Sequence, residues 1–256
     1  MSQQLTDASA AAAQQRAAQA GLTKLLARDM QSLRKLIVPA RMQQTVPQWI
    51  LAVRALIGQY SKASGSLAAN YYDAERLAAR VPGQFTVSMP DPPPDEQVEA
   101  SLRWATKDLW PRDPEDPKTT AVQKLPLEQR LDAAEVKSEA VAQKLVVDSG
   151  RGTIQNAVQR DKQAVGWART AALGACVFCK LLATRGMVYK ADTVGFRAHD
   201  NCHCGAIPVF KGQKFELSPH AAEWERLYRE YAAPHSGDQL NRFRQALDAH
   251  GHTPVL

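Results

Sequence analysis

No stretch of this 256-residue chain is hydrophobic for long, and that absence argues against an integral membrane protein. A membrane-spanning helix needs about 20 consecutive apolar residues, and no run in the sequence approaches that length. The opening residues also lack the basic segment followed by an apolar segment that marks a secretory signal. We therefore expect a chain that does not cross a membrane and that is made in a cytoplasm.

The short motifs of nucleotide chemistry and of serine hydrolases are missing as well. The sequence contains no GxxxxGK[ST] loop, no GxGxxG turn and no GxSxG elbow. A protease would have to rely on scattered residues, of which Asp192, Ser218 and His220 are the candidates. Each has a simpler interpretation: Asp192 fits a turn, Ser218 a helix N-cap, and His220 an exposed first helical turn. The residues alone therefore predict no catalytic site.

Charge is present in moderate excess and is unevenly spread. The net charge is +6, and 45% of the residues are apolar, which is enough for a buried core. The first 80 residues hold ten Lys and Arg against four Asp and Glu, whereas residues 81–145 hold eight against twelve. This asymmetry favours contact with a polyanion or an acidic protein surface, and a solvated helical face explains it equally well. Three tryptophans among basic residues add a nucleic-acid interpretation beside that of an ordinary core and rim: Trp104, Trp110 and Trp167.

Helical periodicity dominates the chain. The apolar spacing predicts helices over 5–37, 47–61, 66–80, 95–109, 119–172 (interrupted near 149–152), 218–233 and 238–249. Short β-prone segments are expected at 84–89, 185–189 and 205–210. The predicted fold class is mainly α, within the α+β type, with a helical N-terminal body and a small β element resembling a zinc knuckle in the C-terminal half.

Two proline-rich segments suggest where the chain divides. PDPPPDE begins at Pro90, and WPRDPEDP begins at Trp110. Because such segments are stiff and extended, we predict a helical region over 1–89, a connector with one helix over 90–118, and a C-terminal domain over 119–256.

Cysteine is scarce, and its distribution is informative. The chain has four cysteines, none of them in the first 175 residues, which is too few for a disulfide-framed secreted scaffold. Cys176 and Cys179 form a Cys-x2-Cys pair, and Cys202 and Cys204 form a second pair at an i, i+2 spacing. Zinc prefers four tetrahedral thiolate or imidazole ligands, and two such pairs can supply them. We therefore predict a structural zinc site at these four residues.

Histidines beside the second pair leave the ligand set open. His199 lies three residues before Cys202 and is a candidate to replace one cysteine or to support the site from outside. His203 should point away from the two sulfur atoms beside it, since side chains alternate along an extended chain. Reduced thiols without metal, or two disulfides in an extracellular particle, remain the alternatives.

Several motifs around the cysteines occur in the same order as in a known family. They are GWAR at 166–169, CVFC at 176–179, LLATRG at 181–186, Tyr189, and HDNCHC at 199–204 followed by Pro208. In this order the sequence resembles the minor capsid proteins of actinobacterial tailed phages, a branch of the Mu-F-like head morphogenesis family. The positions that match the family motif are Cys176, Cys179, His199, Cys202, Cys204 and Pro208, and the resemblance covers about residues 150–210.

The resemblance implies a protein of the virion, inside the phage head near the portal vertex. Its expected partners are the portal protein and the major capsid or scaffold protein, with double-stranded DNA as a further candidate, and several copies would form a ring. Its expected role is to assist procapsid assembly, DNA packaging or ejection. The alternative is a capsid maturation protease that cleaves scaffold or capsid protein, a label that some relatives carry. No protease triad can be transferred onto this sequence.

Overall fold

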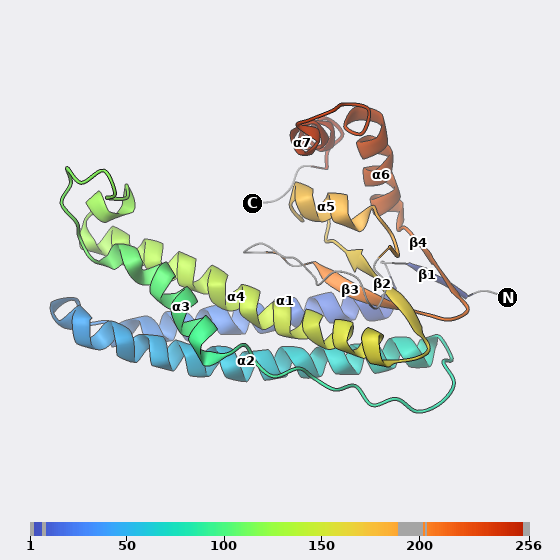
Figure 1. The fold of residues 1–256 in the computed structure, drawn as a ribbon, viewed down its shortest axis with the longest axis horizontal. Coiled ribbons are helices and arrows are strands. Elements are labelled where there is room, and N and C mark those ends of the chain that lie inside the picture. The colour runs from blue at the N-terminus through green and yellow to red at the C-terminus, as the bar shows by residue number, and fades with distance from the viewer. Residues whose placement is uncertain (1–2, 7–8, 189–201, 203, 253–256) are drawn as a thin grey trace. The chain divides into compact units, whose positions relative to one another are not determined.

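The computed structural model describes residues 3–6, 9–188, 202 and 204–252, and it confirms the predicted fold class (Figure 1). Its helices are α1 (Ala10–Leu33), α2 (Met42–Ala78), α3 (Asp95–Thr106), α4 (Leu127–Arg160), α5 (Val177–Ala183), α6 (Pro219–Tyr231) and α7 (Gln239–Ala249). Its strands are β1 (Gln3–Thr6), β2 (Ala164–Thr170), β3 (Gly205–Phe210) and β4 (Gln213–Glu216). No helix in this part of the chain combines the length and the apolar character needed to cross a membrane.

The contacts divide the chain into two compact units built from separated segments. The helical unit comprises Ala20–Ser64 and Asp91–Ser149, and the cysteine unit comprises Met1–Gln19, Gly65–Pro90 and Gly150–Leu256. Helices α1, α2 and α4 each contribute residues to both units. The division into 1–89, 90–118 and 119–256 follows the order of the sequence and stays a prediction.

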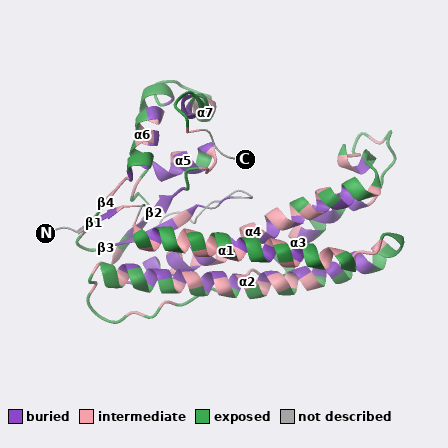
Figure 2. Ribbon diagram, turned by 180° about the vertical axis from the view of Figure 1, so that it is seen from behind, coloured by how far each residue is buried: buried purple, intermediate pink, exposed green. Residues whose placement is uncertain are grey.

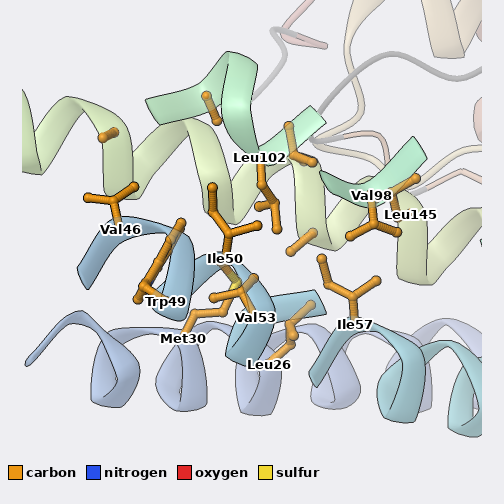
Figure 3. Packing of buried hydrophobic residues seen from close by; sticks show 14 of the residues in the cluster. Leu26, Met30, Val46, Trp49, Ile50, Val53, Ile57, Val98, Leu102 and Leu145 are labelled. Atoms are coloured by element: carbon orange, nitrogen blue, oxygen red, sulfur yellow. The ribbon is translucent and has the colours of Figure 1, made fainter. Parts of the chain in front are cut away.

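The helical unit has one core, to which four helices contribute. Buried and exposed residues alternate along each long helix, as expected of amphipathic helices with one face in a core (Figure 2). Figure 3 shows apolar side chains of α1, α2, α3 and α4 meeting there. They include Leu26, Met30, Trp49, Ile50, Val53, Ile57, Val98, Leu102 and Leu145.

The cysteine unit holds two small sheets and two hydrophobic clusters. Strand β2 pairs antiparallel with β3, with an irregularity between Ala164 and Gly166, and β1 pairs parallel with β4. One cluster packs Tyr72, Trp167 and Phe210 among its members, and the other surrounds the cysteines together with α5, α6 and α7. A two-stranded sheet is marginal by itself, so these clusters must supply much of the stability of this unit.

The structure corrects two expectations about the N-terminal helices. Strand β1 includes Leu5 and Thr6, where the predicted helix was to begin, because Leu5 is buried where β1 pairs with β4. Ser9 then accepts a hydrogen bond from Ala12 N at 3.1 Å as α1 starts. Helix α2 is continuous where two helices, 47–61 and 66–80, were predicted. Gly65 does not break it: a Cβ there would lie 3.3 Å from Met89 Sδ and from Thr153 Oγ1, so the glycine permits close packing.

Four further expectations, farther along the chain, were wrong. Helix α4 runs through the glycines near 149–152, and residues 164–170 form strand β2 where helix was expected. The short apolar run there is buried by pairing with β3, and periodicity cannot distinguish such a strand from a buried helix. Residues 84–88 alternate between exposed and partly buried, but 84–89 form no strand, and 185–188 form none either.

Candidate metal centre

The sulfur atoms of three buried cysteines meet in the cysteine unit. Those of Cys179, Cys202 and Cys204 all lie within 4.8 Å of one another, and Cys179 Sγ lies 3.4 Å from Cys202 Sγ. Two thiolates on one tetrahedral zinc stand about 3.8 Å apart, given zinc–sulfur bonds of about 2.3 Å. These three cysteines are therefore close enough to bind a single metal ion.

The pairing of β2 with β3 explains why residues 23 positions apart come together. Thr170, the last residue of β2, is the register partner of Gly205, the first residue of β3. The chain that leaves β2 towards α5 and the chain that enters β3 from Cys204 therefore start from adjacent points. Helix α5 begins close by, and its first turn carries Cys179 into contact with Cys202.

Cys176 stands at the N-cap of α5. Its sulfur accepts a hydrogen bond from the backbone N–H of Cys179 at 3.4 Å, which satisfies one of the free donors at the start of this helix. Its side chain is only partly buried, and its sulfur is not among the three that lie within 4.8 Å of one another. His199, His203 and Asp192 lie outside the described residues. The predicted four-cysteine set and the role of His199 therefore stay predictions.

The sulfur atoms perturb one another. Hydrogen bonds from Cys179 and Cys204, together with the nearby guanidinium of Arg151, lower the pKa of the Cys202 thiol well below its usual value. Hydrogen bonds with Cys176, Cys202 and Cys204 raise the pKa of Cys179. Thiol ligands must lose their protons to bind a metal ion, so an ion bound here would replace the protons that these sulfur atoms share.

Two buried cations near the cysteines were not predicted from the sequence. Arg151 of α4 donates to the backbone carbonyls of Cys204 at 2.8 Å and of Cys202 at 2.5 Å. Lys180 of α5 is fully buried, donates to the carbonyl of His252, and places its Nζ 5.2 Å from the ring centre of Trp224. Burial lowers the pKa of Lys180. In the sequence, Gly-Arg-Gly at 150–152 suggested a helix interruption, although an arginine between two glycines could have drawn attention to Arg151. Lys180 had no such signal.

Two of the three protease candidates, Ser218 and His220, lie within the described residues. Ser218 is buried at the N-cap of α6, where its hydroxyl accepts a hydrogen bond from Ala221 N at 3.3 Å, as the sequence predicted. His220 is exposed in the first turn of the same helix. These two residues carry no sign of an assembled triad among the described residues.

Comparison with known proteins gives one family. The model of the family described as "VG15 protein" matches residues 6–231, which includes most of the chain and all four cysteines. No curated protein and no solved structure matches the chain.

Proposed function

The chain belongs to the VG15 family, a family of phage proteins, and from this premise we propose that it is a minor capsid protein of the phage head. In this proposal it binds the portal protein at the portal vertex and the inner face of the major capsid or scaffold protein, as several copies in a ring. It assists procapsid assembly, DNA packaging or ejection.

The main support for this proposal is that the motif shared with phage head proteins folds into one structural element. Trp167 of the GWAR segment is the register partner of Pro208, and the cysteines lie at the neighbouring end of the same strand pair. Residues that are up to about 40 positions apart in sequence thus form one small module. A module of this kind, carried with a helical unit, is suited to docking between larger proteins.

Pull-down of the purified chain with the portal protein of the same phage tests this role. We expect a stable complex and, by cryo-electron microscopy of particles, density confined to the portal vertex. Absence of the complex together with absence of density at that vertex would overturn the proposal.

We propose further that the cysteine cluster holds a structural zinc ion. Cys179, Cys202 and Cys204 would supply three thiolates, and Cys176 the fourth, with His199 as the other candidate for that place. A site closed by four protein ligands leaves no position for water or substrate, so its role would be structural. It would fasten the start of α5 to the start of β3.

Elemental analysis of the full-length chain, purified without chelator, tests the zinc site. We expect about one zinc per chain and a thiolate-to-metal charge-transfer band after replacement by Co²⁺. C202S should abolish binding, and comparison of C176S with H199A identifies the fourth ligand. Metal-free protein of native fold would overturn the site and leave reduced thiols or disulfides.

A cluster of unpaired cations favours direct contact with packaged DNA. Arg80 follows α2, Arg160 ends α4, Lys162 precedes β2 and Lys211 follows β3, and all four are exposed. None of the four makes an ion pair within the described part of the chain, whereas Arg226 and Arg229 on α6 are paired with glutamates.

These cations share one end of the cysteine unit, where the two helices end and the β2–β3 pair begins (Figure 1). Arg76 Nε lies 2.7 Å from Asp161 Oδ2, which joins the ends of α2 and α4. Lys211 N donates to the Gln163 carbonyl at 2.9 Å, which joins the loop after β3 to the start of β2. Unpaired lysines and arginines of this kind suit the phosphate backbone of a duplex.

Fluorescence anisotropy with a short DNA duplex at several salt concentrations tests this contact. R160Q/K162Q should weaken binding and reduce the slope of log affinity against log salt by about 1.8, which corresponds to two lost phosphate contacts. R226Q/R229Q removes the same charge from paired positions and serves as the matched control. Equal losses in the two variants, or no binding by the wild type, would exclude this surface.

The maturation protease remains the alternative. Incubation of the chain with scaffold and capsid protein distinguishes it, since only a protease leaves shortened subunits.

A further inference from the structure

The guanidinium of Arg151 is buried against the second cysteine pair. The residue is 3% exposed, and it reaches the site from α4, whereas Cys179 comes from α5. Its Nε donates to the Cys204 carbonyl at 2.8 Å. A terminal nitrogen donates to the Cys202 carbonyl at 2.5 Å and lies 3.2 Å from Cys202 Sγ. The Arg151 side chain thus donates to the backbone carbonyls of both Cys202 and Cys204, and it also contacts the sulfur of Cys202.

We infer that Arg151 is a positioning residue of the metal site, which it serves without ligating the ion. It fixes the carbonyl groups of Cys202 and Cys204, and so fixes the direction in which the two Cα–Cβ bonds leave the chain. It also places a positive charge against the sulfur atoms. This inference rests on the proposed zinc site.

Electrostatics supplies the first reason. A zinc ion with four thiolates carries a net charge of about −2, or about −1 if an imidazole replaces one thiolate. Burying such a charge is costly unless an opposite charge lies close to it. The guanidinium is always protonated, and at 3.2 Å from Cys202 Sγ it offsets part of this charge.

Geometry supplies the second reason. A guanidinium is planar, and its several N–H groups can reach three acceptors at once, which the single nitrogen of lysine cannot do in the same arrangement. Groups outside the ligand set that orient the ligands typically contribute 10–100-fold to metal affinity. Arg151→Lys should therefore keep the charge and lose the orientation, and Arg151→Met should lose both.

Helix α4 offers a matched control. Arg130 is also buried, on the same helix, and also donates to a backbone carbonyl, that of Leu109 at 2.5 Å. It belongs to the helical unit, whereas the cysteines belong to the cysteine unit. Arg130→Met therefore reproduces the loss of a buried arginine without touching the cysteine cluster.

The experiment is a competition for Zn²⁺ between the full-length chain and a chromophoric chelator, with Co²⁺ spectra of each variant. We expect R151M to lose about 10–100-fold in zinc affinity and to show a shifted cobalt–thiolate band. R151K should lose less, and R130M should match the wild type. Circular dichroism identifies any variant that does not fold, and R151K carries the test if R151M does not.

The outcomes separate this inference from the zinc site itself. Wild-type affinity in both R151M and R151K, or an equal loss in R130M, would overturn the role of Arg151 and leave the zinc site standing. A wild-type chain that binds no zinc would overturn the site, and the inference with it.

Discussion

The buried ion pair of Asp161 should be the most sensitive single electrostatic contact of the cysteine unit. The Asp161 side chain is 3% exposed and that of Arg76 is 11% exposed, with Arg76 Nε 2.7 Å from Asp161 Oδ2. Asp161 also accepts hydrogen bonds from Tyr72 Oη at 3.1 Å and from Gln163 N at 2.9 Å. Replacing Asp161 with asparagine keeps the volume, removes the charge and leaves Arg76 without its carboxylate.

We expect D161N to lower the free energy of unfolding by about 3 kcal/mol at neutral pH. Breaking a buried ion pair by removing one partner costs about 3–5 kcal/mol. The lower end applies here because the guanidinium keeps its hydrogen bond to the Gly83 carbonyl at 3.0 Å. The measurement is urea unfolding followed by circular dichroism.

The pH dependence tests the cause. Burial alone would raise the pKa of Asp161, but the hydrogen bonds from Arg76, Gln163 N and Tyr72 outweigh it and hold this pKa below its usual 3.8. A carboxyl whose pKa is lower in the folded state stabilises the fold above its unfolded pKa, and that stability is lost as the pH falls through the folded value. The difference between wild type and D161N should therefore stay constant from neutral pH to about pH 5 and shrink as the pH falls below about 4, since asparagine does not titrate.

Tyr72→Phe is the control, since it removes one hydrogen bond to the same carboxylate and should cost about 1 kcal/mol. A D161N effect no larger than that of Y72F at neutral pH would refute the reasoning. So would a difference between wild type and D161N that stays constant down to acidic pH.

Three further changes test other parts of the fold. Leu102→Ala, at a fully buried position of α3, should cost about 2–5 kcal/mol in urea unfolding, whereas Leu77→Ala at an 80% exposed position should stay within about 0.5 kcal/mol. Gly205→Ala should cost about 1–2 kcal/mol because the new Cβ would lie 3.1 Å from Cγ2 of the buried Thr170. Adding T170S, which removes that methyl group, should recover part of the lost stability. A double variant as unstable as G205A alone would show that this contact is not the cause. Ser218→Ala should cost about 1 kcal/mol through loss of the α6 cap, and if the chain has protease activity that survives in S218A, Ser218 is not its nucleophile.

The sequence predicted correctly those structural features that depend on a few neighbouring residues. Ser218 and Pro219 mark the start of α6 in the sequence as they do in the structure, because an N-cap hydroxyl and a proline at the first helical position act within one turn. Helix α3, at Asp95–Thr106, agrees with the predicted helix over 95–109. Strand β3 was predicted from its β-prone residues and from Gly205, with which it begins.

Features that depend on distant residues were missed. Gly65 resembles a helix break in the sequence, yet its function is to let Met89 and Thr153 approach α2. The strand β2 forms because β3, some 40 residues later, pairs with it. Arg151 gave a weak local signal, and its partners at Cys202 and Cys204 are brought to it only by the fold.

The cysteine cluster stands where the cysteine unit most needs a constraint. The β2–β3 pair has only two strands, and such a pair contributes little stability by itself. Cys179 of α5, the residues before β3 and Arg151 of α4 converge there from three separate parts of the chain. An ion bound at that point would close the long connection between α5 and β3, and its binding free energy would be added to the free energy of folding. Loss of the ion should therefore loosen α5 and β3 together, and leave the core of the helical unit, which has no cysteine among its members, intact.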